Sequence, residues 1–280
     1  MKKISRRSFL AASGLTIAAL ALTACGGSAS TASSAASSVA ASSEAASTST
    51  AAAELTTVEA GKLTMATNAA FPPYEMTTDA GTIEGIDVDT AQAIAEKLGL
   101  ELQIDDMDFD AALLSVQQGK ADIAMAGVTV TDERKNVMDF SDSYATGIQS
   151  IIVPEGSDIA SPDDLAGKKI GTQRGTTGYI YCSDDFGDDA VVAYDDGLTA
   201  VQALNNGQVD AVVIDNAPAK EFVAANPGLV LLDTSYAEED YAIGMAKGNT
   251  ALEDAVNAAL EELKADGTLQ SIVDKYITAE

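Results

Sequence analysis

The stretch Ala112-Leu-Leu-Ser-Val-Gln-Gln-Gly-Lys-Ala-Asp-Ile-Ala-Met-Ala126 is matched in pattern by Ala200-Val-Gln-Ala-Leu-Asn-Asn-Gly-Gln-Val-Asp-Ala-Val-Val-Ile214 in the second half of the chain. Each stretch predicts a helix that ends at a glycine, then a polar turn that contains an aspartate, and then a buried strand. The turn residues concerned are Gly119, Asp122, Gly207 and Asp210. A unit that occurs once in each half of the chain indicates two similar α/β lobes.

A second repeated feature supports the same architecture. Gly61-Lys-Leu-Thr-Met-Ala-Thr67 and Gly167-Lys-Lys-Ile-Gly-Thr172 each place a Gly-Lys turn before a strand. Amphipathic helices are predicted at residues 88–98, capped by Asp87, and at residues 252–263. Helices that alternate with strands predict a mostly parallel sheet flanked by helices in each lobe.

Residues 1–24 resemble a lipoprotein signal peptide. A basic start precedes an apolar run at residues 9–22, which is shorter than the ~20 residues that a spanning helix needs. Leu22-Thr-Ala-Cys25 resembles a lipobox, in which the cysteine receives a lipid and the chain is cleaved just before it. The alternative is an incidental cysteine, and the small residues beside Cys25 favour lipidation. Ser5-Arg-Arg-Ser-Phe-Leu10 also resembles a twin-arginine signal, so the export route stays open.

The segment 25–54 is predicted to be a flexible tether. It consists almost entirely of serine, alanine, threonine and glycine, which bury too little apolar surface to offset the entropy of ordering. The chain from Leu55 onward is long enough for two lobes, each with its own core.

Charge and composition exclude several classes of function. The signal peptide holds four of the 16 basic residues and none of the 43 acidic ones, so the mature chain has a formal charge of −31. Such a surface repels nucleic acid and anionic lipid. The chain has no histidine, and its one cysteine besides Cys25 is Cys182, expected to be a buried hydrophobe. These counts argue against a zinc site, a Ser-His-Asp triad and an internal disulfide, and no cofactor or metal is expected.

Arg134 is the first candidate for ligand binding. It ends the stretch Ala126-Gly-Val-Thr-Val-Thr-Asp-Glu-Arg134, which begins at the end of an apolar strand predicted at residues 123–126. Ligands of open α/β sheets bind beyond the carboxyl ends of the strands, and a guanidinium holds a carboxylate through two parallel hydrogen bonds. Gly127 lets a ligand approach the backbone and Thr129 offers a hydroxyl. The alternative is a surface arginine paired with a neighbouring acid.

Asp215 is the second candidate, because it occupies in the second repeat the strand end that Gly127 occupies in the first. A carboxylate after an apolar strand is costly unless it meets a cation or hydrogen-bond donors. Arg134 binding an α-carboxylate and Asp215 binding an α-ammonium would together make a receptor for a zwitterion. The alternative role for Asp215 is the N-cap of a following helix.

Seven motifs follow one another along the core. They are Thr67-Asn-Ala-Ala-Phe-Pro-Pro-Tyr-Glu75, Gly85-Ile-Asp-Val-Asp89, Met107-Asp-Phe-Asp110, Gly127-Val-Thr-Val-Thr-Asp-Glu-Arg134, Asp139-Phe-Ser-Asp142, Asp164-Leu-Ala-Gly-Lys168 and Gly175-Thr-Thr-Gly178. In this order they resemble the polar amino-acid solute-binding proteins, family 3, of ABC importers. The resemblance implies a two-lobed periplasmic-binding-protein-like (type II) fold that closes on an amino acid like a clamshell. It implies lobe 1 at residues 55–148 plus 240–280, lobe 2 at 149–239, and crossing strands at 149–153 and 241–246.

The resemblance also implies a set of ligand contacts. Phe71 and Phe109 match aromatics that sandwich the ligand side chain. Gly127 and Thr129 match positions whose backbone and hydroxyl meet the ligand head group, and Arg134 and Thr177 match positions that bind its carboxylate. Asp215 matches the partner of the ammonium, and Asn68 stands where several relatives have an acid that reaches the ligand side chain. Asn68, Glu75, Tyr144 and Gln149 are expected to set the choice of side chain, which is polar and either basic or amide-bearing.

The partners implied are a free amino acid, an ABC permease, and the membrane through the lipid on Cys25, with the protein itself a monomer on the extracytoplasmic face. An enzyme resembling the cyclohexadienyl or arogenate dehydratases, with Glu75 or Asp215 as general acid, is the alternative from another class. The anchor and tether favour a transport receptor over such an enzyme. A receptor that senses amino acids rather than transports them stays open.

Replacing Cys25 with alanine tests the lipoprotein interpretation. Because the thiol is the atom that would carry the lipid, Cys25→Ala is expected to release the protein into the medium or to leave it uncleaved. Membrane fractionation with mass analysis of the product checks this. A mutant that is still processed and still membrane-bound would contradict lipidation at Cys25.

Overall fold

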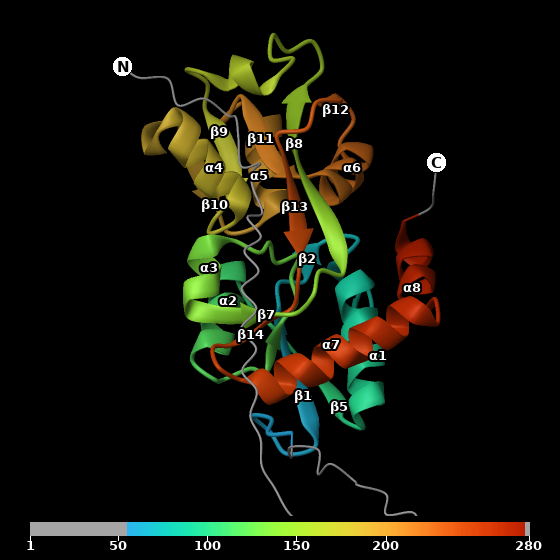
Figure 1. The fold of residues 1–280 in the computed structure, drawn as a ribbon. Helices are drawn as coiled ribbons and strands as arrows, with labels where there is room; N and C mark the ends of the chain where they lie inside the picture. Colours follow the sequence, from blue (N-terminus) through green and yellow to red (C-terminus); the bar gives the residue numbers. More distant parts are fainter. Residues whose placement is uncertain (1–54, 278–280) are drawn as a thin grey trace, which may run out of the picture. The chain divides into compact units, whose positions relative to one another are not determined.

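The computed structural model describes residues 55–277 (Figure 1). The predicted signal peptide, the lipobox at Cys25 and the tether at 25–54 lie outside these residues. Within the described part, no helix is long and apolar enough to cross a membrane.

The first main sheet has the strand order β5-β1-β6-β14-β7. Its strands are β1 (Lys62–Thr67), β5 (Glu101–Asp106), β6 (Ile123–Ala124), β7 (Met138–Phe140) and β14 (Gly244–Ala246). The strands β5, β1 and β6 are parallel, and β14 runs antiparallel to both of its neighbours. Central β1 is buried from its second residue to its last, as its apolar run predicts.

The second main sheet has the order β10-β9-β11-β8-β12, and β13 also pairs with β8. Its strands are β8 (Ala145–Pro154), β9 (Ile170–Gln173), β10 (Val191–Tyr194), β11 (Ala211–Asp215), β12 (Leu229–Leu231) and β13 (Ala237–Tyr241). Again three neighbouring strands, β10, β9 and β11, are parallel, and the next one, β8, is antiparallel. The two sheets therefore share one topology.

Helices flank these sheets, and a small sheet of β2 (Ala70–Phe71), β3 (Glu75–Thr77) and β4 (Ile83–Glu84) precedes the first helix. The α-helices are α1 (Ile86–Leu98), α2 (Phe109–Gln117), α3 (Asp132–Val137), α4 (Thr177–Phe186), α5 (Gly197–Asn205), α6 (Asn216–Ala225), α7 (Thr250–Ala265) and α8 (Thr268–Tyr276). Short 3-10 helices lie at Pro162–Leu165 and Asp188–Ala190. The mixed α/β architecture agrees with the prediction.

The repeated sequence units occupy equivalent places in the two sheets. The helix, turn and strand of the first repeat are α2 and β6, and those of the second are α5 and β11. The turn aspartates also have the same role, because each accepts a backbone hydrogen bond at the adjacent strand. For Asp122 that strand is β1, and for Asp210 the donor is the residue just before β9. Asp122 accepts hydrogen bonds from the N–H groups of Val58 and Thr64, both at 2.8 Å, and Asp210 accepts one from Lys169 N–H at 2.7 Å.

The chain passes between the sheets where β7 is followed by β8, and again where β13 is followed by β14. β8 and β13 pair along five residues and lie side by side in Figure 1. The crossing strand predicted at residues 149–153 is the middle of β8, which begins at Ala145. The one predicted at 241–246 is divided, because β13 ends at Tyr241 and β14 begins at Gly244. The division into lobes stays a prediction.

The predicted capping role of Asp87 is wrong. The helix α1 begins at Ile86 with Gly85 as its N-cap, so Asp87 lies inside the first turn and is buried. Its carboxylate is bound by groups from other parts of the chain, which the local pattern could not show.

Substitutions of the two turn aspartates are expected to differ in their cost. Asp122 is 4% exposed, so Asp122→Ala leaves two N–H groups without an acceptor, and we expect the free energy of unfolding to fall by about 2 kcal/mol or more. Asp210 is exposed, so water replaces it, and Asp210→Ala should cost less than about 1 kcal/mol. Urea unfolding of both variants, followed by circular dichroism, measures the difference. Equal losses would contradict the assignment of the larger role to Asp122.

Candidate functional site

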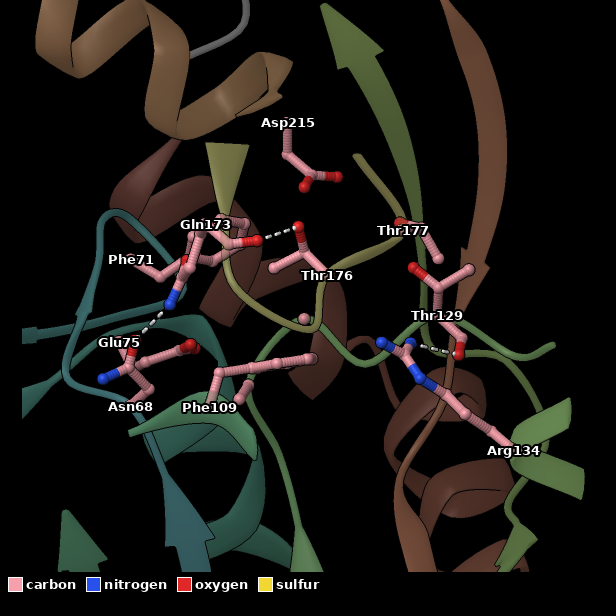
Figure 2. A pocket seen from close by; sticks show the side chains of 12 residues that line it. Asn68, Phe71, Glu75, Phe109, Thr129, Arg134, Gln173, Thr176, Thr177 and Asp215 are labelled. Carbon is pink, nitrogen blue, oxygen red and sulfur yellow. Dashed lines mark hydrogen bonds between the residues drawn. The ribbon is translucent and has the colours of Figure 1, made fainter. Parts of the chain in front are cut away.

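A cavity with an empty volume of about 310 Å³ lies where strand ends and loops of both sheets meet (Figure 2). It is lined by Asn68, Phe71, Glu75, Phe109, Ala126, Gly127, Thr129, Arg134, Gln173, Thr176, Thr177 and Asp215. Eight of the predicted residues, and Glu75, are in this set, whereas Tyr144 and Gln149 are not. The structure thus brings together residues that are up to half the chain apart.

Arg134 is held by the backbone on both sides of the cavity. It lies in the first turn of α3, where its N–H donates to Thr131 Oγ1 at 3.1 Å. Its guanidinium donates from Nη1 to the carbonyl of Thr129 at 2.8 Å and from Nη2 to that of Gly175 at 3.1 Å. The guanidinium carbon lies 5.3 Å from the centre of the Phe109 ring. The side chain has no ion pair among the described residues, so its charge is available to an anion.

Burial shapes the charge of Arg134. The residue is only 8% exposed, and burial lowers the pKa of its guanidinium, which the charge of Glu239 opposes. An arginine keeps its proton at any physiological pH even so. The cavity therefore presents a fixed, poorly hydrated positive charge, the environment in which a carboxylate is bound most strongly.

Asp215 is the last residue of β11 and stands at the N-cap position of α6, but its side chain caps nothing. Its carboxylate instead accepts hydrogen bonds from the Tyr241 hydroxyl and, at 2.8 Å, from Gln149 Nε2. Burial raises the pKa of Asp215 to about 7, the two hydrogen bonds oppose that rise, and the charge of Glu239 adds to it. The geometry therefore favours the cleft-facing role over the N-cap.

Glu239 was not predicted, although it organises the same wall. It lies on β13, and its Oε2 accepts hydrogen bonds from Thr129 Oγ1 at 3.1 Å, from Thr177 Oγ1 at 3.0 Å and from Gln149 Nε2 at 3.0 Å. The two hydroxyls predicted to meet a ligand thus donate to Glu239 in this structure. In the strand Ala237–Tyr241 Glu239 and Tyr241 are the buried residues and lie on one face, which the sequence Ala-Glu-Glu-Asp-Tyr did not indicate.

The backbone of Gly127 lies close to the ring of Phe71. Its φ is +54°, and a Cβ atom there would lie 2.8 Å from Phe71 Cε1, so a larger residue would displace the ring. Its N–H donates to Asp87 Oδ2 at 3.0 Å. The N–H is therefore engaged, and a ligand head group would meet the carbonyl oxygen of Gly127.

Asn68 lies on the opposite side of the cavity from Arg134 in Figure 2. Its amide makes two bonds to protein: Nδ2 donates to the carbonyl of Met107 at 3.0 Å, and Oδ1 accepts from Gln173 Nε2 at 2.9 Å. The second of these bonds joins the two halves of the cavity wall, because Gln173 ends β9. Gln173 and Thr176 are further lining residues that sequence reasoning missed. Thr176 lies in the motif Gly175-Thr-Thr-Gly178, which was the available signal, whereas no pattern distinguishes Gln173.

Glu75 also lies on the side of Asn68 and is 0% exposed. Neither of its oxygens makes a hydrogen bond of ordinary geometry, although Asp87 is the adjacent acid with which it can share a proton. Burial raises the pKa of Glu75 well above its usual range, and the charges of Asp87, Asp215 and Asp106 raise it further.

Asp87 lies behind Glu75 and is better satisfied. It accepts from Gly127 N–H and, at 2.7 and 2.8 Å, from the hydroxyl of Tyr144. Burial raises the pKa of Asp87 to about 6 against these bonds. Tyr144 and Gln149, expected to face the ligand side chain, donate to three of the buried acids, namely Asp87, Asp215 and Glu239. Among the described residues no group of three or more histidine, cysteine or acidic side chains is placed to hold a metal ion.

Comparisons with known proteins point to one class. A sequence profile of the bacterial extracellular solute-binding proteins, family 3, matches residues 63–279. A probable histidine-binding protein of Neisseria gonorrhoeae is 33% identical over 278 residues, which cover 96% of this chain and 95% of that protein. The L-cystine-binding protein TcyJ of Escherichia coli K12 is 33% identical over 226 residues, 79% of this chain and 85% of that protein.

The fold has solved counterparts as well. An ancestral arginine-binding protein bound to glutamine superposes with a TM-score of 0.75 at 41% identity, covering 78% of this chain and 99% of that one. These similar proteins are substrate-binding proteins, so the comparisons do not support the dehydratase-like alternative.

The raised pKa of Asp215 predicts a specific dependence of stability on pH. In the ligand-free protein Asp215 keeps its proton up to about pH 7, whereas the unfolded chain loses it near pH 3.8. The folded state thus binds more protons in this range, and the free energy of unfolding falls as pH rises, by at most about 1.4 kcal/mol per pH unit for one group. Asp215→Asn removes this contribution.

Urea unfolding of the wild type and of Asp215→Asn between pH 4 and pH 8 gives the free energy of unfolding of each protein. In the difference between the two values, the contributions of the other buried acids largely cancel. The stability of the wild type relative to the variant is expected to fall with rising pH. A difference that stays flat, or that rises, would show that Asp215 is ionised throughout.

Proposed function

Because the chain belongs to the bacterial extracellular solute-binding proteins of family 3, we propose that it captures a polar amino acid outside the cytoplasm and delivers it to an ABC permease. Similar proteins are named for binding histidine, cystine, arginine and glutamine, which are all amino acids and support this choice. All of them share the α-carboxylate and α-ammonium groups.

The observation that carries the proposal is the placement of Arg134 and Asp215 in one cavity. Figure 2 shows Asp215 at one wall and Arg134 at another, with open space between them. Arg134 is a buried cation without an ionic partner among the described residues, and Asp215 is a buried carboxylate held by neutral donors. A zwitterion supplies the two opposite charges that such a pair lacks.

We assign the remaining roles from this orientation. Arg134 and the hydroxyls of Thr129 and Thr177 bind the α-carboxylate, and Thr177 begins α4, where free N–H groups favour an anion. Asp215 and the carbonyl of Gly127 bind the α-ammonium. The ligand side chain then extends towards Asn68 and passes between two aromatic rings, Phe71 and Phe109.

Capture and delivery follow from the two connections between the sheets. We propose that the lobes, 55–148 plus 240–280 and 149–239, move about β8 and the β13–β14 passage to close on the ligand. We further propose that a lipid on Cys25 holds the protein, as a monomer, at the outer face of the membrane near its permease, with the segment 25–54 as tether.

Replacing Arg134 tests the function. Arg134→Ala removes a charged bidentate contact and leaves a desolvated ligand carboxylate, which costs about 2–5 kcal/mol. The affinity should therefore fall by roughly 30-fold to several thousand-fold. Titration calorimetry with the amino acid that most raises the melting temperature, chosen from the twenty plus cystine and ornithine, measures the loss.

Arg174→Ala is the matched control, since it removes the same charge from a side chain that is 57% exposed and loosely paired with Asp195 at 3.5 Å. We expect its affinity to stay near that of the wild type. A result in which Arg174→Ala abolishes binding while Arg134→Ala does not would place the carboxylate site elsewhere.

A further inference from the structure

The carboxyl of Glu239 is bound by the same two hydroxyls that the proposed function assigns to the ligand carboxylate. Its Oε2 accepts hydrogen bonds from Thr129 Oγ1 at 3.1 Å and from Thr177 Oγ1 at 3.0 Å. Both threonines line the cavity on the side of Arg134 (Figure 2). Glu239 lies behind them and is only 6% exposed. The wall thus already contains one carboxylate at the hydroxyls where the carboxylate of a ligand is expected to bind.

A hydroxyl group cannot serve two carboxylates at once. It has a single proton to donate, and its oxygen otherwise only accepts. While Thr129 and Thr177 donate to Glu239, they present only lone pairs to the cavity, and lone pairs repel a carboxylate. Each of the two protons therefore goes either to Glu239 or to the ligand.

We propose that Glu239 is an internal competitor of the ligand: its carboxylate holds the hydroxyl protons of Thr129 and Thr177 in the empty cavity and releases them to the α-carboxylate of the bound amino acid. This proposal rests on the function proposed above, because it needs the head group of an amino acid beside the two threonines. No covalent bond changes, since the hydroxyl groups only rotate about their C–O bonds. Glu239 acts through the threonines and is a positioning residue whose presence lowers the affinity.

Glu239 keeps other donors when the two hydroxyls turn away from it. Gln149 Nε2 donates to the same oxygen at 3.0 Å. The hydroxyl of Tyr181, on the same helix as Thr177, is also hydrogen-bonded to this carboxyl. Burial raises the pKa of Tyr181 and the charge of Glu239 raises it further, so the phenol keeps its proton and remains a donor. The exchange therefore leaves no unpaired charge in the wall.

The charge of Glu239 opposes the ligand carboxylate as well. Burial lowers the pKa of Arg134 and the negative charge of Glu239 counteracts this, so the two groups interact. A carboxylate that approaches Arg134 is repelled by that negative charge. Hydrogen bonds to an ionised acceptor are also about twice as strong as those to a neutral one. Both effects make the ionised Glu239 a stronger competitor than an amide of the same shape would be.

Replacing Glu239 with glutamine tests the proposal. The amide has nearly the same size, and it can donate to the threonine oxygens, which leaves their protons to the ligand. Because two charge-assisted hydrogen bonds no longer compete, we expect Glu239→Gln to bind an amino acid about tenfold more tightly than the wild type. Titration calorimetry with L-arginine and with L-glutamine measures the affinities, and circular dichroism establishes that each variant is folded. Glu238→Gln, which removes the same charge from the exposed neighbouring residue of β13, is the control and should bind as the wild type does.

A double-mutant cycle separates the loss of competition from the loss of charge. Thr129→Val and Thr177→Val keep the shape of the side chains and remove the hydroxyls. In the protein that carries both changes, Glu239→Gln should alter the affinity by less than about twofold, because no hydroxyl proton is left to compete for. A tenfold gain that persists in this background would show that the charge acts on the ligand directly, and the proposed competition would be wrong.

The direction of the change in affinity is itself decisive. A carboxylate that only supports the wall predicts weaker binding by a folded Glu239→Gln, and that result would overturn the proposal. If Glu239→Gln does not fold, Glu239→Asp takes its place, because its carboxylate is withdrawn from the hydroxyls by one methylene group. We expect tighter binding there too, and equal or weaker binding would refute the proposal. If no amino acid binds the wild-type protein, the proposed function fails, and this proposal fails with it.

Discussion

Carboxylates that are removed from water must be met by donors or cations, and this requirement connects the elements around the cavity. Asp87 on α1 is bound by the backbone of Gly127 and by Tyr144. Glu239 on β13 is bound by hydroxyls from two segments far apart in the sequence, those of Thr129 and Thr177. Each buried acid thus draws groups distant in the sequence to one place. Because unpaired burial is so costly, these acids specify the arrangement of the loops as well as the chemistry of the site.

The repeated architecture explains why such groups can meet at all. In both sheets the three parallel strands end at the same edge, and polar residues follow the apolar runs there. The first repeat places the small Gly127 at this edge, and the second places Asp215. A shared scaffold therefore supplies different groups from its two copies: backbone in one and a carboxylate in the other. Arg134 lies further along the first of these segments, so the cavity holds a cation as well as the Asp215 carboxylate.

Much of this arrangement followed from local pattern. The periodicity of the repeats indicated the alternation of helix and strand, and the strand ends indicated Arg134 and Asp215, because both depend on short segments of sequence. Asp87 shows where such reasoning fails. Its position before an amphipathic run is typical of an N-cap, yet it is the second residue of the helix and is bound by Gly127 and Tyr144. Glu239 was missed for a related reason, since its partners come from three other segments and no local signal names them.

The buried acids also connect the two ends of the cavity. Asp87 accepts the N–H of Gly127 and adjoins Glu75, and both of these residues line the cavity. When Glu75 is protonated, its carboxyl repels the Asp87 carboxylate less. When Glu75 loses the proton the repulsion increases, and the hydrogen bonds from Gly127 and Tyr144 to Asp87 must offset it. Whatever occupies the side-chain end therefore alters the electrostatics at the head-group end. The two acids titrate as a pair, so discrimination between side chains and affinity for the head group are properties of one coupled site.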